Sequence, residues 1–78
     1  SCYKATKTYD VVIANIVADV LAMINKDLKK VTKPNGIMIL SGIMDKHKNK
    51  VLAKFKDCKI VEEIQKNEWI TLVIKKEI

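Results

Sequence analysis

Two short runs of uninterrupted apolar residues restrict the folds open to this chain more than any other feature. They are Val11–Ala14 and Ile37–Leu40. A strand with one face in solvent alternates apolar and polar side chains, whereas a strand in a parallel sheet is buried on both faces and is apolar throughout. A stretch with helical periodicity separates the two runs. The sequence therefore predicts two parallel strands, the first over Asp10–Ala14, joined by a right-handed helical crossover.

The stretch between these strands is predicted to be a helix from Ala18 to Val31. Its side chains divide into an apolar and a polar side with helical spacing. The predicted apolar side comprises Val20, Leu21, Ile24, Leu28 and Val31, and the predicted polar side comprises Asn25, Lys26, Lys29 and Lys30. Pro34 cannot continue a helix, and Asn35-Gly36 favours a turn. We therefore expect a turn over Lys33–Gly36 before the second strand.

The second half of the chain adds another helix and two more strands. We expect the helix over Lys46–Lys56, with an outer strand over Cys58–Gln65 behind it. A further strand over Trp69–Ile74 follows after only the short segment Lys66–Glu68, so the two strands should form an antiparallel hairpin. The predicted order is strand, helix, strand, helix, strand, strand, which places the chain in the α/β class.

Length, charge and cysteine content narrow the class of protein. The 78 residues, 49% of them hydrophobic, suit one small globular domain and not a disordered linker. The net charge of +6 comes from dispersed Lys without any Arg, the preferred partner of guanine, so a nucleic-acid partner is disfavoured. Cys2 and Cys58 are too few for a disulfide framework or a zinc cluster, which favours a reducing, cytoplasmic setting. No apolar run approaches the roughly 20 residues of a membrane span, and Ser1–Thr8 is expected to be a loop.

Asn15 interrupts the apolar pattern where the first predicted strand ends. Ser41 and Gly42 stand at the matching place after the second strand, which we expect them to end. Open parallel sheets bind ligands at the carboxyl ends of their strands. An Asn there can accept the N–H bonds of a substrate amine and so direct the nitrogen lone pair. The alternative is that Asn15 only caps the helix or forms a turn.

Several other polar or reactive side chains are expected to be structural. His47 lies between two lysines and should be solvated, not catalytic. Cys58 should be a small core residue, and Trp69 should pack against the sheet instead of binding a ligand. Glu62 and Glu63 are adjacent, so on a strand they point to opposite faces and form no catalytic pair. We expect no metal site.

Three segments together resemble one enzyme family. The segments "DVVIANIVADVL", "PNGIMILSGIMD" and "EWITLVIKK" are similar to the carboxyl-terminal half of the catalytic domain of ribosomal protein L11 methyltransferases, which are class I enzymes dependent on S-adenosylmethionine. The resemblance implies a partial Rossmann-like class I methyltransferase fold, to which this chain supplies the fourth to seventh strands. It also implies that Asn15 borders both the cofactor and the methyl acceptor. Asn35 replaces the first Gly of the family's turn, and both residues tolerate a positive φ.

The resemblance further implies a function. The family transfers a methyl group from S-adenosylmethionine to the α-amine and lysine side chains of ribosomal protein L11. Its glycine-rich cofactor turn and acidic ribose ligand have no counterpart in this sequence. We therefore expect residues 1–78 to be a carboxyl-terminal fragment of the catalytic domain, inactive alone and prone to self-associate through its first strand. Two other functions stay open, a small module that binds partners by strand addition and a methyltransferase with another acceptor.

Overall fold

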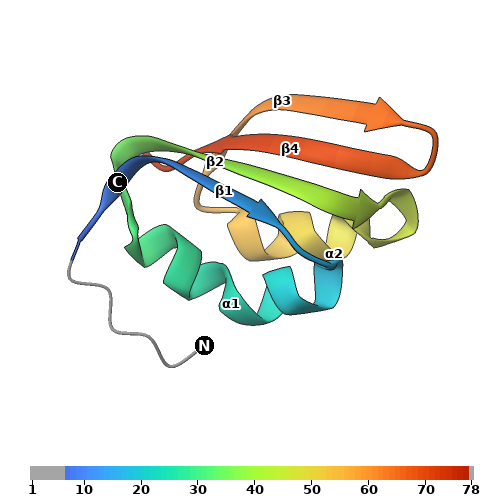
Figure 1. Ribbon diagram of the computed structural model, residues 1–78, viewed down its shortest axis with the longest axis horizontal. Coiled ribbons are helices and arrows are strands. Elements are labelled where there is room, and N and C mark those ends of the chain that lie inside the picture. Colours follow the sequence, from blue (N-terminus) through green and yellow to red (C-terminus); the bar gives the residue numbers. More distant parts are fainter. Residues whose placement is uncertain (1–6, 78) are drawn as a thin grey trace.

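The computed structural model describes residues 7–77, and Figure 1 shows their arrangement. The part of the predicted Ser1–Thr8 loop that covers residues 1–6, and Cys2 with it, lies outside the described residues. The strands are β1 (Tyr9–Asn15), β2 (Thr32–Met44), β3 (Lys59–Lys66) and β4 (Trp69–Lys75), and the helices are α1 (Ala18–Lys30) and α2 (Lys48–Leu52). Single 3₁₀ turns flank α2 at Asp45–His47 and Ala53–Phe55. This is the predicted order of elements.

The four strands form one sheet in the order β1-β2-β4-β3. β1 and β2 are parallel, as their apolar runs predicted, and α1 makes the crossover between them. β4 pairs antiparallel with both β2 and β3. The predicted hairpin is confirmed, since Lys66 pairs with Trp69 across a two-residue turn in which Asn67 has a φ of 57°. Both helices lie against the same face of the sheet (Figure 1).

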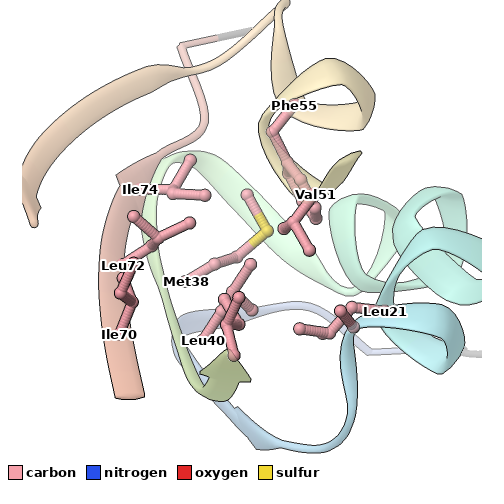
Figure 2. Close-up of a cluster of buried hydrophobic side chains, with 10 residues drawn as sticks. Leu21, Met38, Leu40, Val51, Phe55, Ile70, Leu72 and Ile74 are labelled. Carbon is pink, nitrogen blue, oxygen red and sulfur yellow. The ribbon is translucent and has the colours of Figure 1, made fainter. Parts of the chain in front are cut away.

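The core lies between that face and the helices. Its side chains come from the central strands, α1, α2 and the 3₁₀ turn after α2, and they point toward one another in Figure 2. The buried apolar residues are Ala18, Leu21, Met38, Leu40, Ile43, Val51, Phe55, Ile70, Leu72 and Ile74. Complete burial of a large apolar side chain contributes about 1.5–3 kcal/mol each, so this cluster supplies the main driving force for folding.

The opposite face of the sheet carries apolar side chains that no described element covers. On β1, Val12 and Ala14 pack toward the core, whereas Val11 and Ile13 point the other way and are 52% and 71% exposed. β1 is also an edge strand of the described sheet. β1 was predicted to be a central strand buried on both faces. Within residues 7–77 it is an edge strand, and only the face toward the helices is covered.

β2 is longer than predicted and is irregular at two places. The predicted strand Ile37–Leu40 extends over Thr32–Met44, and its pairing shifts register near both ends. The predicted turn at Asn35-Gly36 appears as one of these irregularities, with Asn35 at a φ of 67°. A β-carbon on Gly36 would stand 2.8 Å from the Lys33 carbonyl oxygen, so the backbone approaches itself too closely there for a side chain.

The second helix is much shorter than the predicted Lys46–Lys56. Only Lys48–Leu52 is α-helical, and the turns on either side tighten to 3₁₀ geometry, which is common at helix ends. Val51 and Phe55 still point inward together and are fully buried. Tertiary packing thus determines how far the α-helix extends.

The inward face of α1 is rotated relative to the prediction. Asn25, expected on the polar side, is only 8% exposed, and its side-chain Nδ2 donates a hydrogen bond to the Ala22 carbonyl at 2.8 Å. Val20, expected on the apolar side, is 39% exposed, and Met23 is 80% exposed. The buried positions are Ala18, Leu21 and Asn25. Val20 and Met23 therefore face away from the core.

Candidate functional site

The candidate site lies where β1 ends, beside the last residues of β2. Asn15 is the last residue of β1 and pairs in register with Ser41 of β2. Gly42 follows Ser41, and its α-carbon lies against the Asn15 side chain, because a β-carbon there would be 2.6 Å from Asn15 Oδ1. The structure thus brings together the three residues that the sequence singled out. The prediction that Ser41 and Gly42 end the second strand is wrong, since β2 continues through them to Met44.

Asn15 does not cap the helix that follows it. The residue at the N-cap of α1 is Val17, in an extended conformation, and no side chain makes a capping hydrogen bond there. Asn15 itself is exposed. Within residues 7–77 no hydrogen bond occupies its side-chain amide, so both the carbonyl oxygen and the NH₂ group are free to meet a ligand.

The Asn15 side chain lines an open hollow of about 380 Å³. The residues around this hollow are Asn15, Ile16, Val17, Gly42 and Trp69. A smaller hollow of about 160 Å³ adjoins it and shares Val17, Gly42 and Trp69 as walls. The smaller hollow extends the site toward Asp19, Met44 and His47. One exposed amide in a mostly apolar wall is suited to orient a small polar group.

Trp69 and His47 belong to this site, which the sequence interpretation missed. Trp69 is 49% exposed and borders both hollows, so packing against the sheet leaves about half of its side chain accessible there. It lies there because the start of β4 pairs with the end of β2, where Trp69 is opposite Met44. His47 is half-buried in the 3₁₀ turn that follows β2 and borders the smaller hollow instead of being fully solvated. No local sequence signal could have located Trp69 there, because its place depends on the register between β2 and β4.

An ion pair stands at the rim of the smaller hollow. Asp19, in the first turn of α1, accepts a hydrogen bond from the Lys50 ammonium of α2. That bond and the positive charge of Lys50 lower the pKa of the Asp19 carboxyl, which is largely exposed. At neutral pH the Asp19 carboxylate therefore places a negative charge on one side of the rim, and the Lys50 ammonium pairs with it.

The remaining reactive side chains lie elsewhere. Cys58 is partly buried against the core, as expected, and burial together with the neighbouring Asp57 charge raises the pKa of its thiol. It is thus poorly suited to act as a thiolate nucleophile. Glu62 pairs with Val73 and Glu63 with Leu72, so the two carboxylates point to opposite faces of β3, as predicted.

Neither a metal cluster nor a membrane span was found in residues 7–77. No three His, Cys, Asp or Glu side chains there are grouped so as to hold a metal ion. None of the helices in that range has the length and apolar character to cross a membrane.

Comparison with known sequences connects the chain with one family. The family model described as "Ribosomal protein L11 methyltransferase (PrmA)" matches residues 2–77. A ribosomal protein L11 methyltransferase from a Nitratiruptor species is 57% identical over 75 residues, which are 96% of this chain and 26% of that protein. The corresponding protein of Campylobacter lari is 48% identical over 77 residues, 99% of this chain and 28% of that protein. The chain spans about a quarter of the length of these relatives.

Solved structures share the fold. A crystal structure of a ribosomal protein L11 methylase from Lactobacillus delbrueckii subsp. bulgaricus superposes with a TM-score of 0.87 at 24% identity, over 94% of this chain and 39% of that one. The N-methyltransferase NodS from Bradyrhizobium japonicum superposes with a TM-score of 0.76 at 11% identity, over 99% of this chain and 56% of that one. The four-stranded sheet and its hairpin are thus part of a Rossmann-like methyltransferase fold.

Proposed function

The chain belongs to the ribosomal protein L11 methyltransferase family, and from this membership we propose that it is the carboxyl-terminal part of a catalytic domain that methylates amines of ribosomal protein L11. The acceptors are the α-amine and lysine side chains, and the methyl donor is S-adenosylmethionine. The observation that carries the proposal is the exposed Asn15 amide at the carboxyl end of β1, opposite Ser41 and beside an open hollow. Parallel sheets bind their ligands at this end of the strands.

Asn15 has the chemistry needed to position an amine. When bound, S-adenosylmethionine supplies a methyl group on a positively charged sulfur, which is activated toward direct displacement. Asn15 Oδ1 accepts an N–H bond of the neutral acceptor amine and so aims the nitrogen lone pair at the methyl carbon. Val17 and Trp69 form the apolar wall that limits water around the amine. Positioning of the two reactants is the main contribution that such a reaction requires from the protein.

The residues of this chain fit only the methyl-facing part of a cofactor site. Among residues 7–77, the hollow around Asn15 is lined by one amide and apolar side chains, without an acidic side chain to hold ribose hydroxyls. We propose that residues from the rest of a longer methyltransferase complete the cofactor pocket, in keeping with the match to about a quarter of the relatives' length. The 78-residue chain alone is then inactive, and methyl transfer to ribosomal protein L11 by the purified chain would contradict this.

A chimeric enzyme tests the role of Asn15. In the Nitratiruptor relative, the matching segment is replaced by this chain, which is 57% identical to it. The chimera is expected to methylate ribosomal protein L11, and Asn15→Ala is expected to lower kcat/KM about 100-fold, the effect typical of a misplaced reactant. Asn49→Ala is the matched control, because Asn49 is an exposed amide on α2 and lines neither hollow. Equal activities of the two variants would refute the proposed role of Asn15.

The bare strand β1 supports a second proposal, that the isolated chain self-associates. Val11 and Ile13 are largely exposed on the uncovered face, and β1 is at the edge of the sheet with one side of its backbone unpaired by any described strand. A mostly apolar groove of about 390 Å³ runs beside it, between β1 and the part of α1 that carries Ile24 and Leu28. Exposed apolar edges of this kind favour pairing with another chain. Sedimentation should show dimers or larger species, and a monomer at high concentration would contradict the proposal.

A further inference from the structure

The end of β2 contains a bulge at the candidate site. Leu40 pairs with Leu72 and Ile43 pairs with Ile70, so two residues of β2, Ser41 and Gly42, face a single residue of β4. Gly42 has a φ of +80°, which L side chains rarely adopt. Bulges locally bend a strand and re-aim its neighbours, and they are common next to active sites. The bulge thus turns the backbone of β2 at the level of Asn15.

The bare α-carbon of Gly42 provides the space in which the Asn15 side chain lies. A β-carbon at position 42 would be 2.6 Å from Asn15 Oδ1 and 3.8 Å from Asn15 Cγ. The first distance is far inside van der Waals contact, so the Asn15 amide would have to move away from its present position. The Ile16 carbonyl oxygen, at 3.6 Å from the same point, would be only in ordinary contact. The Asn15 amide is therefore the group that a side chain at position 42 would displace.

The close approach of Gly42 limits the positions of the Asn15 amide on one side. In the described part of the chain, no hydrogen bond fixes this side chain, and it is exposed on its other side. If a β-carbon at position 42 occupied this space, the Asn15 amide would rotate about its side-chain bonds into the hollow. An amide that must hold an acceptor amine in line with a methyl group cannot rotate freely without losing rate.

We propose that Gly42 is a positioning residue that acts through Asn15: its missing β-carbon and its left-handed backbone create the slot that orients the Asn15 amide toward the acceptor amine. The functional half of this inference rests on the proposed role of Asn15. The structural half, that Gly42 sets the orientation of the amide, stands independently and has its own measurement.

The structural half is tested by NMR on the 78-residue chain with ¹⁵N-labelled side-chain amides. Loss of one NH₂ signal pair in Asn15→Ala identifies the Asn15 signal. In Gly42→Ala this signal is expected to shift and to lose its contact to the α-protons at position 42. Gly36→Ala is the matched control, because it also introduces a forbidden β-carbon, against the Lys33 carbonyl and the Thr32 side chain, but far from Asn15 along the sheet. An unmoved Asn15 signal in folded Gly42→Ala would overturn the proposal.

The functional half is tested in the chimeric enzyme with a double-mutant cycle. Gly42→Ala is expected to lower kcat about as much as Asn15→Ala. In the Asn15→Ala background the clash is absent, so Gly42→Asn, which also tolerates the positive φ, is expected to cause no further loss. Gly42→Asn, whose residue tolerates a positive φ, should lose as much activity as Gly42→Ala, since it carries the same β-carbon. Additive losses in the double variant, or full activity in Gly42→Asn, would overturn the inference. A chimera inactive before mutation would count against the proposed function alone and leave the NMR result standing.

Discussion

The two faces of the sheet are alike in composition but differ in what covers them. On β2, Met38 and Leu40 face the helices and are fully buried, while Ile39 between them faces the other way and is only half-buried. Ile39 pairs with Ile13 on one side and Val73 on the other, so an apolar row crosses the uncovered face. Sheets with apolar residues on both faces are typical of doubly wound α/β folds, in which helices cover both sides. The comparison shows that these strands have the composition of strands buried on both faces. Within residues 7–77, helices cover only one of the two faces.

The largest expected effect comes from truncating neighbouring side chains on the two faces. Leu40→Ala should lower the free energy of unfolding by about 2–5 kcal/mol, because it leaves a cavity in the closed core. Ile39→Ala should lower it by about 1 kcal/mol, because the side chain is already partly in water. Urea denaturation at low protein concentration measures both. Equal losses would mean that the uncovered face is buried in solution.

A charge on the uncovered face should separate association from stability. Ile13→Lys places an ammonium on a side chain that is 71% exposed, so it should change the free energy of unfolding by about 0.5 kcal/mol or less. The same charge should repel a second copy and shift the sedimentation profile toward monomer. An unchanged profile in a chain that self-associates would place the contact elsewhere on the molecule.

Another small effect concerns an ion pair on the covered side. The Lys29 ammonium lies over the Phe55 ring and is 2.9 Å from Asp57 Oδ1, and its hydrogen bond lowers the pKa of the Asp57 carboxyl below its ordinary value. When the pKa of a carboxyl is lower in the folded chain than in the unfolded chain, its charge stabilises the fold at any pH above the unfolded-chain pKa. This stabilisation is lost as the pH falls through the lowered pKa. Because Asp57 is 69% exposed, Asp57→Asn should cost only about 0.2–1 kcal/mol at pH 7.

The same variant has a signature in its pH dependence. Stability of Asp57→Asn should fall less steeply than that of the parent chain as pH drops below about 4, the region in which a free Asp protonates. Thermal unfolding from about pH 7 to about pH 2.5 measures the two curves across this region. Parallel curves would show that the Lys29–Asp57 pair does not contribute to stability in solution.

Much of the fold could be predicted because its signals are local. The apolar runs identified the parallel pair β1 and β2, and the short connection before Trp69 identified the hairpin. Asn15 and Ser41 could be placed side by side because the carboxyl ends of neighbouring parallel strands share one edge. The inner face of α1 was predicted less well, since Asn25 satisfies its amide on the Ala22 carbonyl and so can be buried, which a polarity pattern does not reveal.

The sequence by itself determined the order of elements, the parallel pairing, the hairpin and the placement of Asn15 beside Ser41, because residue period and turn chemistry act over short stretches of chain. Only the tertiary structure decided the bulge at Ser41-Gly42, the contact of Gly42 with Asn15, and the arrival of Trp69 at the same hollow. These features depend on the register between β2 and β4, whose paired residues are far apart in the sequence. That register is set by which side chains fill the shared core, and no local pattern records it.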